Sequence, residues 1–338
     1  MAFFQTPNTI RASGGLGAPV TGIHFLVVAG GGASARNRQS MCGGGGGGGL
    51  RTSWPGGSGR GAASESTLTF NVGSVYTCTV GAGGPGGTGS AAASCISANG
   101  ADSSISSDNG VFATITSMGG GAALRVGDSN YPPTCPTAND GGTGGWHYTA
   151  PGGSGQPGQG YDGRQGAASP KYAMFGGSSA ASQAGSKQGA SGLQVNIDNN
   201  NYYWSGGGGG SGHGTEGGAA GSGGQGGGGG GGQAPPNYGA GSGGGNAINS
   251  GQPGGIGPYN ASASPLQGAG GANSGGGAGG SNAYGFPSPG GGVPGGSGIV
   301  ILRMPTSVYS GTVTGSPTVT TVGSDTVITF TATGTYTA

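Results

Sequence analysis

The chain has 338 residues, of which 94 are glycine and 20 are proline, and its formal net charge is +1. Glycine weakens helices and adds no side-chain packing to strands, so this composition excludes most ordinary folds. Only 6% of the residues are charged and the ten basic ones are scattered, which argues against a nucleic-acid-binding face.

Apolar and β-branched runs predict strands before and within the glycine-rich part. Residues 23–28 (IHFLVV) form a mostly apolar run, which predicts a central strand buried on both faces. Residues 68–72 and 75–80 flank Gly73 and Ser74, a spacing typical of a hairpin. Further strands are predicted at residues 111–116, at residues 193–197 and, again doubly buried, at residues 299–302.

The composition changes after Pro305 to alternating threonine, valine and serine. Residues 318–322 and 326–331 frame a short glycine-containing loop, which predicts a hairpin. We therefore divide the chain into a glycine-rich module of residues 1–305 and a β tail of residues 306–338 that completes the same particle.

Long glycine runs occupy residues 43–49, 206–210 and 226–232. They are compatible with a solvated tether or with extended polyproline II rods, which have no internal hydrogen bonds and need neighbouring rods to satisfy their backbone groups. Low charge and strands at both margins favour packed rods. The predicted fold is thus mostly β and irregular, with strands at both ends clamping a glycine-rich body of packed polyproline/polyglycine II rods, and with no substantial helix.

Cysteine usage gives no metal or redox motif. Cys42, Cys78, Cys95 and Cys135 lack CxxC spacing. Two disulfides or four separate thiols are both compatible with this pattern, and we favour buried or idle thiols. We expect no signal peptide and no membrane insertion, because no charged leader with an apolar segment and no long apolar stretch is found.

No recognisable catalytic or cofactor motif stands out. The GxGxxG match at residues 221–226 follows from composition, and neither Lys171 nor Lys187 follows a glycine as a phosphate-binding loop requires. Three histidines, His24, His147 and His213, are far apart in the sequence. A carboxylate pair of Asp102 with Asp108 or Glu65 stays open, although nothing singles it out. We expect no enzyme activity, no cofactor and no metal.

Aromatic residues form islands between the glycine runs, where they serve either recognition or packing. The densest island is Tyr202, Tyr203 and Trp204, which follows three asparagines. We take it as the first candidate for a receptor-binding surface, together with Trp146, Tyr148 and Tyr131.

Five segments occur in an order that resembles the glycine-rich modules of bacteriophage tail-fibre and adhesin proteins. They are FLVVAGGG at residues 25–32, VYTCTVGAGG at 75–84, NGADSSIS at 99–106, ITSMGGGAA at 115–123 and GGSGIVILRMP at 295–305. The resemblance implies a virion protein whose glycine-rich region packs as polyproline II rods and whose loops contact the host. The tip adhesins of T-even-like phages are the nearest comparison. Unlike in those adhesins, we recognise no separate N-terminal fibre-attachment domain in the sequence, so we keep shaft, side-fibre and capsid positions open.

The order of the module differs from that family in one respect. A strand like residues 325–337 (DTVITFTATGTYT) typically precedes the LVVAGGG strand, whereas here it closes the chain. We therefore expect the tail to pair with residues 23–28, within the chain or from a neighbouring subunit.

The expected function is that of a non-enzymatic structural protein of a phage tail or fibre, assembled in the host cytoplasm and displayed on the virion. Its expected partners are other tail, fibre or capsid proteins, further copies of itself and a host-surface protein or polysaccharide. The alternatives are a free surface-binding protein resembling an ice-binding protein, and a capsid-decorating fibre. A polysaccharide-degrading enzyme lacks a residue set to support it.

Overall fold

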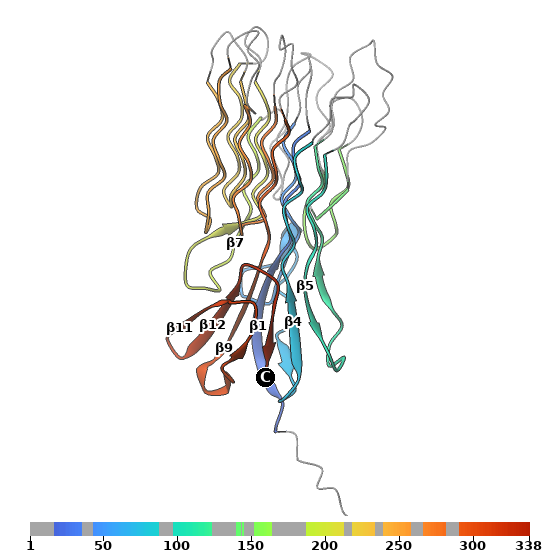
Figure 1. The fold of residues 1–338 in the computed structure, drawn as a ribbon, viewed down its shortest axis with the longest axis vertical. Coiled ribbons are helices and arrows are strands. Elements are labelled where there is room, and N and C mark those ends of the chain that lie inside the picture. Colours follow the sequence, from blue (N-terminus) through green and yellow to red (C-terminus); the bar gives the residue numbers. More distant parts are fainter. Residues whose placement is uncertain are drawn as a thin grey trace, which may run out of the picture.

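The computed structural model describes residues 17–35, 43–87, 97–123, 140–142, 144, 152–163, 187–212, 218–233, 239–257, 266–281 and 291–338. Two β-sheets lie at one end, and extended glycine-rich segments run side by side away from them (Figure 1). In this part of the chain the helical residues are confined to the 3-10 turns η1 (Gly59–Gly61) and η2 (Thr306–Val308). The predicted fold class, mostly β and irregular without substantial helix, is confirmed.

The first sheet has the strand order β11-β12-β9-β1-β2, with β3 also pairing with β1. Its pairings are antiparallel. The strands are β1 (Val20–Val28), β2 (Leu50–Thr52), β3 (Leu68–Phe70), β9 (Ile299–Pro305), β11 (Thr318–Val322) and β12 (Asp325–Phe330).

The second sheet has the order β10-β13-β4-β5-β6 and packs against the first. Its strands are β4 (Val75–Thr79), β5 (Ser103–Ser107), β6 (Ile115–Ser117), β10 (Thr312–Val313) and β13 (Gly334–Thr337). A separate two-stranded hairpin is formed by β7 (Leu193–Gln194) and β8 (Tyr203–Trp204).

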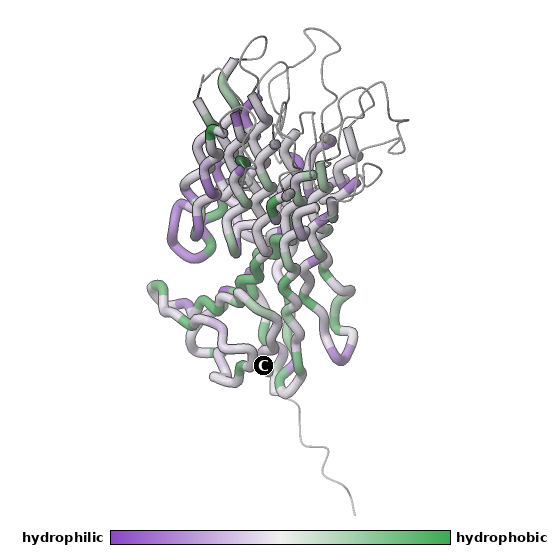
Figure 2. The backbone as a smooth tube through the Cα atoms, turned by 45° about the horizontal axis from the view of Figure 1, so that its top comes forward, coloured by the Kyte–Doolittle hydropathy of each residue, from purple (hydrophilic) through white to green (hydrophobic). Residues whose placement is uncertain are grey.

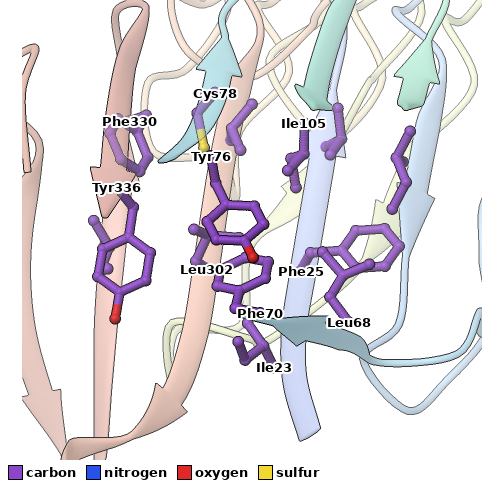
Figure 3. Packing of buried hydrophobic residues seen from close by; sticks show 14 of the residues in the cluster. Ile23, Phe25, Leu68, Phe70, Tyr76, Cys78, Ile105, Leu302, Phe330 and Tyr336 are labelled. Atoms are coloured by element: carbon purple, nitrogen blue, oxygen red, sulfur yellow. The ribbon is translucent and has the colours of Figure 1, made fainter. Parts of the chain in front are cut away.

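Both faces of the first sheet are covered at its central strands β1 and β9, which explains the unbroken apolar runs of these two strands. In β1, Phe25 and Val27 face the core between the two sheets, whereas Leu26 and Val28 face a second core on the side of β7 and β8. Strand β9 alternates in the same way. Aromatic stacking joins the two sheets, because the ring centroids of Phe70 and Tyr76 lie 3.7 Å apart. Figure 3 labels both side chains in the core between the sheets.

Several strand predictions are confirmed, one predicted hairpin is wrong and one predicted strand is confirmed only at its end. The doubly buried strands near residues 23–28 and 299–302 and the tail hairpin β11–β12 are confirmed. The predicted hairpin of residues 68–72 and 75–80 is wrong, because β3 pairs with β1 whereas β4 pairs with β5 and β13. Only the end of the predicted strand at residues 111–116 belongs to β6.

The tail does not pair with residues 23–28, contrary to our expectation. Strand β12 instead pairs with β9, which separates it from β1, and β13 pairs with β4 in the other sheet. The tail therefore spans both sheets. Its last residue, Ala338, exchanges backbone hydrogen bonds with Gly73 and Ser74 in the turn between β3 and β4.

Beyond the end of β1 the chain continues as an extended rod, residues 29–34, whose hydrogen-bond partners repeat every three residues. The N–H groups of Gly30 and Ala33 donate to Ala101 and Ala98, three residues apart in one neighbouring segment. Those of Gly31 and Ser34 donate to residues 296 and 293 of another. A partner that returns after three residues is the signature of the threefold polyproline II helix.

This rod is enclosed by hydrogen-bonded neighbours on every side. Its N–H groups donate to segments 98–101, 293–296 and 46–49, and its C=O groups accept from segments 120–123, 84–87 and 278. The run 226–232 shows the same pattern, with hydrogen-bonded neighbours in segments 206–212, 221–224, 241–245, 268–271 and 277–280 and at residue 252. Neighbouring backbones thus satisfy the polar groups that a lone rod would leave to water.

Of the four cysteines, Cys78 lies in the described part of the chain, and Cys42, Cys95 and Cys135 lie outside it. Cys78 is a free thiol fully buried in the core between the sheets, labelled in Figure 3. Burial raises the pKa of this thiol, because a thiolate would be desolvated there.

We expect Cys78 to resist alkylation in the folded protein. In a variant with Cys42→Ser, Cys95→Ser and Cys135→Ser, maleimide labelling of Cys78 should be at least about a thousandfold slower under native conditions than in denaturant, because reaction needs unfolding. Mass spectrometry at timed intervals measures both rates. Equal rates would show that the core between the sheets is open.

Candidate contact surface

The densest aromatic island belongs to the β7–β8 hairpin, whose loop, residues 196–202, we call the asparagine loop. Figure 2 shows this hydrophilic loop projecting from the side of the glycine bundle. The Asn199 N–H donates to the carbonyl of Asn196 at 2.9 Å, and the Asn200 N–H donates to the Asp198 carboxylate at 3.1 Å. Asn199 has a φ of 67°, a conformation that asparagine tolerates better than most residues.

Trp204 is a packing residue and not a contact residue, which corrects its place in the predicted surface. Its side chain is fully buried in the second core with Val195 and Ile197, and its indole N–H donates to the carbonyl of Val195 at 2.9 Å. Trp204 therefore fastens the hairpin to the first sheet.

The two neighbouring tyrosines are half-buried, and Tyr202 packs at the edge of this core. The ring of Tyr202 meets Trp204 edge-on, with centroids 5.8 Å apart, and the Tyr203 N–H donates to the carbonyl of Asn246. Each therefore has a fixed position and a partly open face. The exposed side chains beside them belong to Asn199, Asn200 and Asn201.

A tryptophan that the sequence did not single out holds the asparagine loop in place. The Trp54 indole N–H donates to the side-chain oxygen of Asn196 at 2.7 Å. The guanidinium of Arg303 lies 4.5 Å from the centroid of the Trp54 ring and donates to the carbonyl of Ile197 at 3.0 Å. His24, in β1 as predicted, packs edge-on against the same ring.

The other predicted contact residues, Trp146, Tyr148 and Tyr131, lie outside the described residues, as do His147 and His213. Their part in a contact surface stays a prediction. The structure thus brings Tyr202 and Tyr203 together with Trp54 and the asparagine loop.

A small cavity of about 150 Å³ lies between η1 and the β7–β8 hairpin. Arg60 at its rim is bound to Asp162 at 3.0 Å, and the Gln159 amide donates to the carbonyl of Thr116 at 3.1 Å. The N–H of Gly155, with Arg60, lowers the pKa of the Asp162 carboxyl. These polar groups are engaged by the protein itself. The cavity is lined by Leu50, Ser58, Gly59, Arg60, Gly61, Gln159, Tyr161, Gly192, Leu193, Trp204 and Ser205.

The carboxylates considered as a catalytic pair each serve a separate structural contact. Asp102 accepts from the N–H of Gly119 at 2.8 Å, Asp108 accepts from that of Val75 at 3.1 Å, and Glu65 pairs with an arginine. No group of three potential metal ligands occurs within the described segments. In those segments, likewise, no helix has the length and apolar character to cross a membrane.

Comparison with known proteins places most of the chain in one family model. Residues 12–259 match the model described as a glycine-rich domain. No curated protein and no solved structure matches the chain.

Proposed function

We propose that this chain, which belongs to the glycine-rich domain family, is a non-enzymatic virion protein of a phage tail or fibre that contributes to host attachment. The observation that carries the proposal is the rod bundle. Rods held by backbone hydrogen bonds make a stiff body without a side-chain core, so the segments between rods are free to vary in sequence. The order of phage-like segments in the sequence supports the same class of protein.

The join between bundle and sheets supports a role in display. Strand β1 runs directly into the rod of residues 29–34, and segment 293–296 leads into β9. The chain's described ends meet at the sheet end, because Ala338 bonds to Gly73 and Gly17 lies beside Val72. Anchoring to other tail, fibre or capsid proteins through the sheet end would leave the bundle projecting, and several such copies would sum weak contacts.

The outward positions of the rods favour attachment over an ice-binding function. Along one surface rod they carry Ala219, Ser222 and Gln225, and along the next Gly239, Ser242 and Gly245. This mixture of glycine with small and polar residues lacks the regular repeat of one side chain that a flat ice-binding face needs. The exposed asparagine loop and the half-buried tyrosines beside it instead suit a protein or polysaccharide receptor on the host surface.

Labelling tests the virion assignment. A phage whose copy of the gene carries an epitope tag should yield purified particles that bind gold-labelled antibody at the tail or fibre. Label on the capsid would indicate a decorating fibre. Absence of the tagged chain from every particle fraction would contradict the proposal.

Binding of purified protein to host cells tests the contact residues. We expect Tyr202→Ala/Tyr203→Ala and Trp146→Ala/Tyr148→Ala/Tyr131→Ala to weaken binding about tenfold each, the effect of losing 1 to 2 kcal/mol at an aromatic contact. Val308→Ala, an exposed apolar change at the sheet end, is the matched control. Binding as tight as that of the natural protein in all variants would show that these residues do not belong to the contact surface.

A further inference from the structure

Strand β11 leaves one edge of the first sheet open. It pairs with β12 on one side, and in the described part of the chain no strand pairs with its other side. Residues 318–321 are exposed, and Val319 retains 40% of its accessible surface. Figure 1 shows β11 and β12 projecting from the base of the molecule.

The turn geometry fixes which backbone groups of β11 point outward. Gly323 and Ser324 form a two-residue turn between Val322 and Asp325, and Gly323 has a φ of 60°, as the first position of a type II′ turn requires. The residues that flank such a turn form a hydrogen-bonded pair, and bonded pairs then alternate along the strands. Val319 and Thr321 therefore direct their N–H and C=O groups away from β12.

This edge lacks the features that usually prevent strands from pairing. Natural edges are protected by charges, internal proline, bulges or very short strands. Strand β11 reads TVTTV, and its register with β12 is unbroken over all five positions. The nearest acidic residue along the hairpin, Asp325, is neutralised by Arg303 at 2.9 Å.

We propose that β11 is a homodimer interface, at which β11 of a second copy pairs antiparallel about a twofold axis through Thr320. This register sets Val319 opposite Thr321 of the second copy, and Thr321 opposite its Val319. Both residues present outward backbone groups, so each exchanges N–H···O=C bonds with the residue opposite.

Charge and side-chain chemistry favour a second copy as the occupant. An edge that carried charges of one sign would set like charges opposite each other across the twofold axis, but every position of β11 is threonine or valine. Cross-strand pairs of β-branched residues stabilise sheets. The pairing joins the first sheets of two copies into one continuous sheet and carries two glycine bundles on one base.

A charge-exchange experiment tests this interface in the full-length chain. Analytical ultracentrifugation should show a dimer for the natural sequence. Val319→Lys/Thr321→Lys should be monomeric, and so should Val319→Glu/Thr321→Glu, because like charges then face each other. Val319→Lys/Thr321→Glu places opposite charges across the axis and should restore the dimer. When the two like-charged variants are mixed, the lysine variant should form heterodimers with the glutamate variant, although neither dimerises alone.

Controls separate this edge from the others. Val308→Lys/Thr312→Lys adds the same charge at exposed positions of η2 and β10 and should leave the dimer intact. Far-ultraviolet circular dichroism and melting curves confirm that each variant is folded. A natural chain that stays monomeric at about 100 µM, well above the micromolar dissociation constants typical of weak specific complexes, would overturn the proposal. So would a dimer that survives both like-charged variants.

Discussion

Replacing Gly31 with alanine is expected to destabilise the protein strongly, although it adds a single methyl group. A Cβ at this position would lie under 3.0 Å from the carbonyl oxygen of Gly276, which is backbone and has no rotamer to relieve the clash. Gly230, in the other enclosed rod, is obstructed in the same way by the carbonyl of Gly241. We expect either Gly31→Ala or Gly230→Ala to cost about 4 kcal/mol or more, because neighbouring rods must separate and lose hydrogen bonds together.

Gly245→Ala is the matched control and should have the opposite sign. A Cβ there meets nothing within 4 Å, and the backbone is not in the left-handed region that favours glycine. Alanine should then stabilise the protein by about 0.4 to 1 kcal/mol by restricting the unfolded chain. Denaturant unfolding followed by circular dichroism measures all three variants. Similar stability for Gly31→Ala and Gly245→Ala would show that the glycine segments form a loose tether and not packed rods.

Removing residues 306–338 should abolish the cooperative unfolding transition. Strand β12 pairs with β9 from Asp325 to Phe330, and the tail supplies four fully or almost fully buried side chains, Val327, Ile328, Phe330 and Tyr336. Truncating one large buried side chain to alanine typically costs about 2 to 5 kcal/mol. Losing all of them exceeds the roughly 5 to 15 kcal/mol by which a domain is stable.

Smaller changes in the tail make this result interpretable. Phe330→Ala should lower stability by about 3 to 5 kcal/mol and still permit folding. Ser307→Ala/Thr331→Ala, at exposed positions of the same tail outside β11, should change stability by about 0.5 kcal/mol or less. Calorimetry compares these variants with the truncated chain. A truncated chain that melts like the full chain would mean that the tail is dispensable.

The elements that sequence predicted correctly are those whose signal is local. The unbroken apolar runs of β1 and β9 require cover on both faces, and the structure provides it. The tail hairpin combines β-branched strands with a glycine turn. The glycine runs form rods because only glycine permits backbones to approach as closely as Gly31 and Gly276 do.

The errors concern partners, which no local pattern specifies. A two-residue turn between β3 and β4 suggested a hairpin, but Leu68 pairs across to Ile23 and Thr77 to Thr335. Strand β5 was missed because its sequence, SSISS, has a single apolar residue.

The sequence marked only part of the candidate contact surface, again because no local pattern specifies which residues meet. The YYW island marked the hairpin, but its sequence gave no indication that Trp204 turns inward while the tyrosines stay partly open. The contact of Trp54 with Asn196 joins residues 142 positions apart in the sequence. It forms only when the β7–β8 hairpin packs against the first sheet. Residues so distant in sequence carry no shared local signal.

The threefold repeat of the rods also limits how the particle can change in length. Inserting one or two residues into the rod of residues 29–34 would rotate every later N–H toward a different neighbour, whereas three residues restore the original facing. Each triplet adds about 9 Å, since a residue rises about 3.1 Å. Growth or shortening of the bundle during evolution should therefore proceed in whole triplets, shared among adjacent rods.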